Sequence, residues 1–265
     1  MPWEPDRTQP IIAPDRALAY YAEVLGCDRA ELSLPDTLVA TFQQRALDRM
    51  VQRIGSAPPA RWPTPIFWPL ASGSYRGSPL AVARLPIGAP AAAAALELMV
   101  AAGVRTVLLV GSAGSLQPHL PIGSLALPTE AFRHEGTSHH YLSPSDTVSA
   151  SPAMVDALCS AALRRIGAEP ARGPTWTTDA PYRECAATVG RMRSAGVLTV
   201  EMEAAALYAV GLHRGVRVGM ILAISDELCD SWQPGFHTLA YARALLMAAD
   251  IALEAASSLR GPAES

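Results

Sequence analysis

The sequence predicts an α/β fold, with one domain built on a central mixed, largely parallel twisted sheet that helices flank. Short runs rich in β-branched residues alternate along the chain with longer segments rich in alanine and leucine, which is typical of this class. The chain has 265 residues, of which 50% are apolar and 17% are charged, so it can bury a complete core. Because no internal repeat or low-complexity linker divides the sequence, residues 1–265 are expected to form a single domain.

The predicted elements follow in order along the chain. Five apolar, β-branched runs predict strands at Leu38–Phe42, Leu80–Leu85, Thr106–Val110, Ser124–Leu127 and Val216–Ile224. Six longer segments predict helices at Ala17–Val24, Gln43–Ile54, Ala89–Ala102, Pro152–Ile166, Met202–Arg214 and Phe236–Ser258. The last of these is amphipathic, since Leu239, Leu246, Ile251 and Leu253 recur near helical spacing. A proline-rich patch, Pro58–Pro69, predicts an ordered surface loop.

Charge and hydropathy narrow the classes of function. The formal charge is −3, and arginines and acidic residues are scattered along the chain without a basic stripe, so nucleic-acid binding is not expected. Residues 1–10 are polar and hold three prolines, unlike a signal peptide. The longest apolar run, Gly88–Val104, contains Glu97 and is short for a bilayer. We therefore expect a cytoplasmic protein with no membrane partner.

Lysine and cysteine usage excludes further chemistry. All 21 basic residues are arginine, so Schiff-base chemistry, pyridoxal phosphate attachment and a Walker-type phosphate loop are excluded. The four cysteines lie far apart with no C-x-x-C spacing, which predicts reduced core thiols. The group His134-Glu135 with His139 and His140 has one residue too many for the H-E-x-x-H zinc motif, so no metal is expected.

The first motif, Gly111-Ser112-Ala113-Gly114-Ser115, directly follows the predicted strand Thr106–Val110. Ligands of open parallel sheets bind beyond the carboxyl ends of strands, and small residues let backbone N–H groups approach an anion or a flat ring. A simple tight turn explains the same residues equally well. A dinucleotide fingerprint fits worse, because the third glycine is missing and prolines follow.

The second motif, Thr199–Ala206, embeds two carboxylates, Glu201 and Glu203, in an apolar segment. If a helix begins near Met202, both carboxylates lie at its first turn, where the helix dipole favours them. A carboxylate held there can accept hydrogen bonds from the vicinal hydroxyls of a sugar. Helix capping alone is the competing interpretation.

The third motif, Ser225-Asp226-Glu227, ends the strongly apolar run from Val216. An acid in this place emerges at the sheet edge beside apolar residues, where partial burial would suit it to act as a general acid. An ordinary Ser-Asp helix cap is the alternative for this motif taken alone. Convergence of the three motifs at one sheet edge favours a catalytic site.

Taken in order, these motifs resemble the nucleoside phosphorylase superfamily, which includes purine nucleoside phosphorylases, uridine phosphorylases and the methylthioadenosine/adenosylhomocysteine nucleosidases. The resemblance lies in Gly-Ser-Ala-Gly after a strand, Pro-Ile-Gly-Ser-Leu-Ala-Leu-Pro, Val-Glu-Met-Glu-Ala-Ala-Ala and Ile-Ser-Asp-Glu-Leu, and it runs from about Ser72 to about Leu246. It implies a nucleoside phosphorylase-like fold, cleavage of the bond between a nucleobase and its ribose, and a small-molecule nucleoside as partner. It also implies a homo-oligomer, either a dimer or a trimer of dimers.

The resemblance also assigns residues. Glu203 binds the ribose hydroxyls, Met202 packs under the sugar, Glu201 assists and His140 lies near the ribose 5′ side. Asp226 protonates or hydrogen-bonds N7 of a purine, which relieves negative charge on the leaving base. The remaining base-binding residues that it implies are Ala113, Gly114, Asp179, Tyr182, Arg183 and Ser225. Uridine phosphorylases carry a glutamine and an arginine in this region to bind uracil; Arg183 is present here but the glutamine is missing, and Asp226 independently favours a purine.

Departures from the family concern the second substrate, inorganic phosphate. An arginine that phosphorylases place just before the glycine motif is replaced by Leu109, and the N-terminal Gly-Asp-Pro loop is missing. Gly111, Ser112 and Arg45 remain as expected phosphate-binding residues, with Arg76 or Arg84 as other replacements. We expect phosphorolysis with phosphate as co-substrate and no cofactor. Phosphate-independent hydrolysis and a catalytically silent nucleoside-binding protein are the alternatives.

Overall fold

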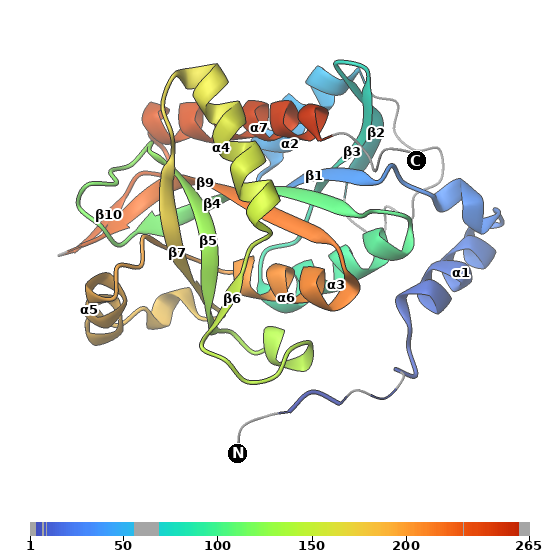
Figure 1. Ribbon diagram of the computed structural model, residues 1–265, viewed down its shortest axis with the longest axis horizontal. Coiled ribbons are helices and arrows are strands. Elements are labelled where there is room, and N and C mark those ends of the chain that lie inside the picture. The colour runs from blue at the N-terminus through green and yellow to red at the C-terminus, as the bar shows by residue number, and fades with distance from the viewer. Residues whose placement is uncertain (1–3, 7, 9, 56–68, 230, 260–265) are drawn as a thin grey trace.

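A computed structural model describes residues 4–6, 8, 10–55, 69–229 and 231–259 (Figure 1). In this part of the chain a ten-stranded mixed sheet lies between two layers of helices. The strands are β1 (Thr37–Thr41), β2 (Leu70–Tyr75), β3 (Ser78–Arg84), β4 (Thr106–Ser115), β5 (Leu125–His134), β6 (Thr147–Ser149), β7 (Ala171–Thr178), β8 (Thr199–Glu201), β9 (Arg217–Leu228) and β10 (Trp232–Pro234). The α-helices are α1 (Pro14–Leu25), α2 (Gln44–Ile54), α3 (Ala89–Ala101), α4 (Pro152–Ile166), α5 (Ala186–Ser194), α6 (Ala204–Arg214) and α7 (Leu239–Ser258).

The strand order explains how distant motifs meet. It runs β10-β9-β5-β7-β8-β4-β1-β3-β2, and β9 also pairs with β4, so β4, β8, β7, β5 and β9 close into a ring. The long central pairings β1–β4, β4–β9 and β5–β7 are parallel. Strands β2 and β3 pair in antiparallel fashion, and so do β5 and β9 over a shorter stretch. The predicted mixed, largely parallel sheet is confirmed, and its closure on itself was not foreseen.

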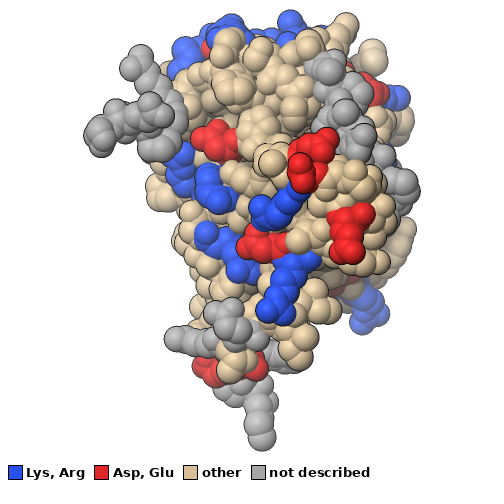
Figure 2. All heavy atoms as spheres, turned by 90° about the vertical axis from the view of Figure 1, so that its right-hand side faces the viewer, with Lys and Arg blue, Asp and Glu red and all other residues tan. Residues whose placement is uncertain are grey.

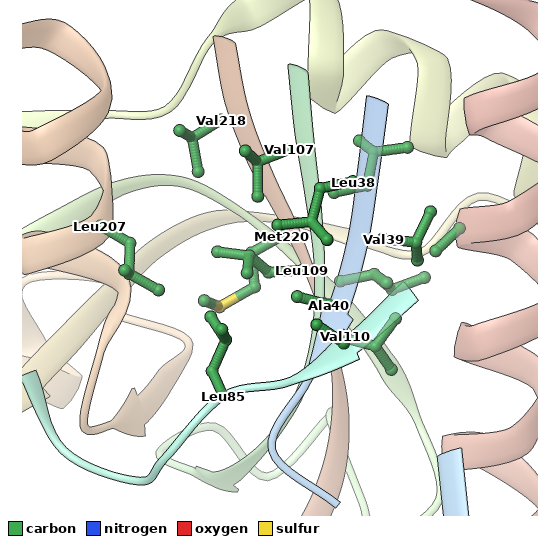
Figure 3. Packing of buried hydrophobic residues seen from close by; sticks show 14 of the residues in the cluster. Leu38, Val39, Ala40, Leu85, Val107, Leu109, Val110, Leu207, Val218 and Met220 are labelled. Carbon is green, nitrogen blue, oxygen red and sulfur yellow. The ribbon is translucent and has the colours of Figure 1, made fainter. Parts of the chain in front are cut away.

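The helices cover the two faces of the sheet as their burial requires. Helices α3 and α6 pack together on one face, while α2, α4 and α7 pack on the other (Figure 1). Alanines dominate α6 and α7 and let them approach the strands closely; eight residues of α6, from Ala204 to Gly211, are buried. Between the layers, aliphatic side chains of β1, β4 and β9, among them Val39, Leu109 and Met220, form the core (Figure 3).

The observed elements confirm the predicted α/β pattern and lengthen three strands, among them β5, which continues to His134 beyond the predicted end at Leu127. β4 continues to Ser115 and β9 to Leu228, beyond the predicted ends at Val110 and Ile224. Helices α6 and α7 begin two and three residues later than predicted, at Ala204 and Leu239. Strands β2, β6, β7, β8 and β10 and helix α5 were missed. The predicted loop Pro58–Pro69 lies outside the described residues except for Pro69.

Two surface properties bear on partners. Among the described residues, no helix is both long enough and apolar enough to cross a membrane. On the face seen in Figure 2, basic and acidic side chains are interspersed and form no continuous basic stripe.

Candidate active site

A β-bulge in β9 fixes the direction of Asp226. β4 and β9 run in parallel register up to Ala113 and Ile224, and then Gly114 pairs with Asp226, so Ser225 is the extra residue. Its carbonyl accepts a hydrogen bond from the N–H of Gly235 instead of pairing with β4. Bulges commonly re-aim a side chain beside a functional site. Here the bulge turns the buried Asp226 toward the end of β4.

Two side chains hold the Asp226 carboxylate. The Ser225 hydroxyl lies 2.7 Å from Oδ1, and the Trp232 indole N–H donates to Oδ2 over 2.9 Å. Trp232 comes from β10, which pairs with the last residues of β9. The hydroxyl of Ser225 faces Asp226 and the carbonyl of Ala113, and the role of Ser225 at the base stays a prediction. The sequence motifs do not indicate this tryptophan, because Trp232 reaches Asp226 only through the pairing of β10 with β9.

Glu201 is the last residue of β8, and its carboxylate binds groups of the protein itself. Its carboxylate accepts hydrogen bonds from Thr177 Oγ1 at 2.5 Å and from the backbone N–H groups of Glu203 and Ala204 at 2.7 and 2.6 Å. Burial raises the pKa of Glu201 although these hydrogen bonds oppose the shift. Glu201 thereby fixes the turn that carries Glu203, and its assistance in sugar binding stays a prediction.

Glu203 lies at the N-terminus of α6 and is buried. Its Oε1 accepts a hydrogen bond of 2.6 Å from the N–H of Gly88, which lies in the loop before α3 with φ +99°, a conformation that favours glycine. Burial and the neighbouring charge of Glu201 both raise the pKa of Glu203. Met202, between the two glutamates, is partly exposed. A carboxylate with one fixed oxygen remains available at this edge.

The Gly-Ser-Ala-Gly-Ser motif is not a turn. Residues 111–115 continue β4 and pair with both β9 and β8. The small residues are required by packing: a Cβ at Gly111 would lie 2.8 Å from Leu222, and one at Gly114 would lie 2.3 Å from Leu228 and 3.3 Å from Asp226 Oδ2. Gly114 also pairs with Val200, the residue before Glu201, so the first and third motifs meet the second at one place.

The hydroxyl of Ser112 is already engaged. It lies 2.5 Å from the phenol oxygen of Tyr241, in the first turn of α7. Burial raises the pKa of Tyr241, the bond to Ser112 and the charge of Arg45 lower it, and the charge of Asp226 raises it. Arg45, exposed in the first turn of α2, is thus close enough to Tyr241 to affect its ionisation. Leu109, at the position of a family arginine, is fully buried in the core.

The segment after β7 holds three of the predicted base-binding residues, Asp179, Tyr182 and Arg183. The Asp179 carboxylate accepts a hydrogen bond of 2.9 Å from the N–H of Gly136 and so ties two loops together. Tyr182 and Arg183 are exposed on a 3₁₀ turn, Pro181–Arg183, that points them away from the protein. The ring of Tyr182 is fully exposed in this chain, and its role at the base stays a prediction. Glu184, next along the chain, is half-buried instead.

The histidine group does not converge. His140 is exposed on the 3₁₀ turn Ser138–His140. Glu135 turns back to accept hydrogen bonds from the N–H groups of Thr137 and Ser138. Among the described residues, no three His, Cys, Asp or Glu side chains are grouped as a metal site would require.

A cavity of about 670 Å³ opens elsewhere, between α7 and the connections that precede β5 and β7. His119, Glu169 and Arg243 line it, whereas Glu203, Asp226 and Ser112 do not. The candidate site therefore rests on the convergence of its side chains at the ends of β4, β8 and β9. A fixed acid and a second buried carboxylate, set against glycine-lined backbone, can stabilise a cationic sugar and protonate its leaving group.

Comparisons with known proteins identify the family of the chain. Residues 43–257 match the model of the phosphorylase superfamily. A guanosine phosphorylase of Halorubrum lacusprofundi is 33% identical over 172 residues, which are 63% of this chain and 68% of that protein. A uridine phosphorylase of Haemophilus influenzae is 29% identical over 170 residues, 57% of this chain and 66% of that protein.

A solved structure shows the same fold. A uridine phosphorylase of Vibrio fischeri superposes with a TM-score of 0.76 at 25% identity, covering 91% of this chain and 100% of that chain. Because the family model spans most of the sequence, from β1's end to the last turn of α7, the chain belongs to the phosphorylase superfamily and is a nucleoside phosphorylase-type pentosyltransferase.

Proposed function

We propose that the protein cleaves the N-glycosidic bond of a purine nucleoside by phosphorolysis, releasing the free base and ribose 1-phosphate. The observation that carries this proposal is the bulge in β9, which brings Asp226 into register with Gly114 and leaves its carboxylate fixed by Ser225 and Trp232. An acid held in this way beside glycine backbone suits the N7 edge of a purine, whereas uracil offers no equivalent nitrogen.

At the base, Asp226 is the proposed catalytic acid. As phosphate oxygen bonds to C1′, the C1′–N9 bond breaks and its electron pair passes to the purine ring. A proton from Asp226 to N7, or a hydrogen bond that holds a proton there, neutralises the charge that develops. Ala113 and Gly114 would form the floor beside the ring. Their small size leaves room for a flat base.

At the sugar, Glu203 is the proposed ligand of the ribose hydroxyls. Gly88 fixes one of its oxygens, and the capping of α6 by Glu201 sets its position. A carboxylate near the ribose also stabilises the positive charge of an oxocarbenium-like transition state. Met202, partly exposed between the glutamates, would pack under the sugar, and Glu201 acts as a positioning residue.

For phosphate, Gly111, Ser112 and Arg45 form the proposed site, to which Tyr241 is added. The Ser112 and Tyr241 hydroxyls lie together, and the charge of Arg45 lowers the pKa of Tyr241. Two hydroxyls and one arginine provide less charge than the arginines of other phosphorylases, so we expect weak phosphate affinity.

The test is a panel of purine and pyrimidine nucleosides assayed for base release with and without phosphate. Phosphorolysis predicts negligible release in phosphate-free buffer, and ribose 1-phosphate in amounts equal to the base when phosphate is added. A kcat/KM for uridine that exceeds the kcat/KM for every purine nucleoside would contradict the purine assignment.

Hydrolysis is the second candidate function. It is favoured by the bond between Ser112 and Tyr241, which occupies a hydroxyl that phosphate would need, and by the burial of Leu109. A hydrolase would release free ribose at a rate that added phosphate does not change. A catalytically silent binder would instead gain thermal stability from nucleosides without releasing base, and Asp226→Asn would change no rate.

We also propose that the chain works as a homo-oligomer, a dimer or a trimer of dimers. The exposed aromatic rings of Tyr182, Trp232 and Phe236 support this proposal, because such side chains are enriched at interfaces. Sedimentation equilibrium would measure the assembly, and a monomer at micromolar concentration would contradict it.

A further inference from the structure

Glu227 is the member of the Ser225-Asp226-Glu227 motif to which the proposed mechanism assigns no task. Successive side chains of a strand point to opposite faces, so the side chain of Glu227 leaves β9 on the face opposite to that of Asp226. Glu227 is half-buried, and its Oε1 accepts a hydrogen bond of 2.9 Å from the N–H of Ile122, in the connection before β5. The residue after the proposed catalytic acid is therefore tied to a distant segment of the chain.

The segment 122–124 is bonded to β9 on both sides of the bulge. The N–H of Gly123 donates to the carbonyl of Ile224 over 3.0 Å, and the N–H of Ile224 donates to the carbonyl of Ser124 over 3.0 Å. These two bonds lie just before the bulge, and the bond to Glu227 lies just after it. The segment 122–124 thus holds the bulge between its two attachments.

The side chain of Ile122 also contacts the residue that holds the bulge from the other direction. The N–H of Gly235 donates to the carbonyl of Ser225 over 2.9 Å. A Cβ at Gly235 would lie 2.6 Å from Ile122 Cδ1 and 2.7 Å from the carbonyl oxygen of Ser225, so the glycine leaves room for both. A displacement of Ile122 would therefore reach Ser225, and through it Asp226.

Packing behind the segment 122–124 is incomplete. Ile122, Gly123 and Ser124 line the cavity of about 670 Å³, so they face open space there. Ala240 of α7 meets Gly123, where a Cβ would lie 3.0 Å from the Cβ of Ala240. Because a packed layer does not back the whole segment, its position depends on the hydrogen bonds to β9.

We propose that Glu227 is a positioning residue for Asp226. By holding the N–H of Ile122, it fixes the bulge of β9 and with it the direction of the Asp226 carboxylate toward N7 of the purine. Its own carboxylate lies on the opposite face of β9, so it acts through Asp226 and not on the base. The proposal rests on the proposed function, since N7 is the group that Asp226 is proposed to meet.

The experiment compares Glu227→Ala and Glu227→Gln with the wild type on guanosine. Alanine removes the acceptor, so kcat/KM should fall about 10-fold, mainly through kcat, because Asp226 loses its direction while the sugar contacts remain. Glutamine keeps an oxygen that can accept from the N–H of Ile122, so this variant should stay within about twofold of the wild type.

The same variants are then assayed on 7-deazaguanosine, in which a C–H group replaces N7. On this substrate Glu227→Ala should lose less than about twofold in kcat/KM, because the interaction that it weakens is already missing. The ratio of the two kcat/KM values does not depend on the amount of folded enzyme, so partial unfolding cannot imitate this result.

Glu130→Ala is the matched control. Glu130 is also a half-buried glutamate of a strand, in β5 opposite β6, and its side chain makes no hydrogen bond or ion pair within the described part of the chain. This variant should keep the wild-type kcat/KM on both substrates.

The outcomes separate this inference from the proposed function. If the wild type discriminates against 7-deazaguanosine, then equal losses of Glu227→Ala on both substrates, or no loss on guanosine, overturn the role of Glu227 and leave the function standing. A Glu227→Gln variant as slow as Glu227→Ala on guanosine also overturns that role, because the hydrogen bond is then not the cause. A wild type that cleaves both substrates equally, or neither, contradicts the proposed function itself.

Discussion

Asp226 shows how single contacts define this site. Its carboxylate is held by a neutral indole N–H from Trp232 and by its neighbour Ser225. A neutral donor fixes the carboxylate without adding the positive charge that an arginine would bring. The geometry at this residue therefore depends on β10, a three-residue strand of which all members are exposed.

Trp232→Phe tests this contact. The substitution removes the N–H donor and keeps an aromatic ring, so Asp226 should lose its orientation and kcat should fall about 5- to 10-fold, while KM changes less than twofold. The loss is modest because Trp232 is 62% exposed and water can replace part of the bond. Steady-state kinetics on a purine nucleoside measures it. A rise in KM with an unchanged kcat would instead indicate weaker binding of the sugar, and it would contradict a role of Trp232 through Asp226.

Several site residues could be recognised from the sequence and others could not. Glu203 and Asp226 carry their chemistry in short motifs beside apolar runs, and the structure brings those runs together. Trp232, Tyr241 and Gly88 reach the site through pairing and packing between distant elements. Tyr182 was predicted at the base from the resemblance, and the structure leaves its side chain fully exposed, because the direction of a side chain on a 3₁₀ turn is not encoded in residue type.

At the scale of elements, strand extension was the main feature that sequence patterns missed. Residues 111–115 are small and polar, and this composition is typical of a turn; pairing with β8 and β9 keeps them in a strand. β7 contains Gly173 and Pro174, which read as breakers, yet it pairs with β5 and β8. A Cβ at Gly173 would lie 2.8 Å from Leu198, so the glycine serves close packing. Long apolar helices such as α4 were predicted to the residue.

An ionic cluster joins three helices behind the site. Asp250 of α7 is buried and pairs with Arg49 of α2 at 2.9 Å and Arg165 of α4 at 2.6 Å. Burial opposes ionisation, but hydrogen bonding to Arg49 and the charges of Arg165, Arg49 and Arg53 prevail and lower the pKa of Asp250. The cluster fixes α7, whose first turn carries Tyr241.

Asp250→Ala should lower the free energy of unfolding at pH 7 by about 2–3 kcal/mol, because it leaves half-buried arginines facing one another. A lowered pKa contributes stability above the unfolded value near 3.9, and that contribution is lost as pH falls through the folded value. The difference between variant and wild type should therefore shrink toward pH 3. Urea denaturation measures it.

Asp156→Ala is the matched control for this cluster. Asp156 pairs with Arg172 on the surface, where both side chains are exposed, so its loss should change the free energy of unfolding by less than about 0.5 kcal/mol. Equal effects of the two substitutions would contradict a structural role for the buried cluster.

At the scale of the whole molecule, closure of the sheet creates the site. Because β9 pairs with β4 as well as β5, strands distant in sequence meet in one ring, and the ends of β4, β8 and β9 carry Gly114, Glu203 and Asp226 to one place. Helices cover both faces of the sheet (Figure 1). The central claim is that Asp226 meets N7 of a purine held at this place.

The most direct test compares guanosine with 7-deazaguanosine, in which a C–H group replaces N7, for base release by the wild type and by Asp226→Asn. The account predicts that the wild type loses about 100-fold or more in kcat/KM on the 7-deaza substrate, and that Asp226→Asn is slowed on guanosine but little further on the analogue. Equal, independent losses from the substitution and from the missing N7 would contradict contact between Asp226 and the purine.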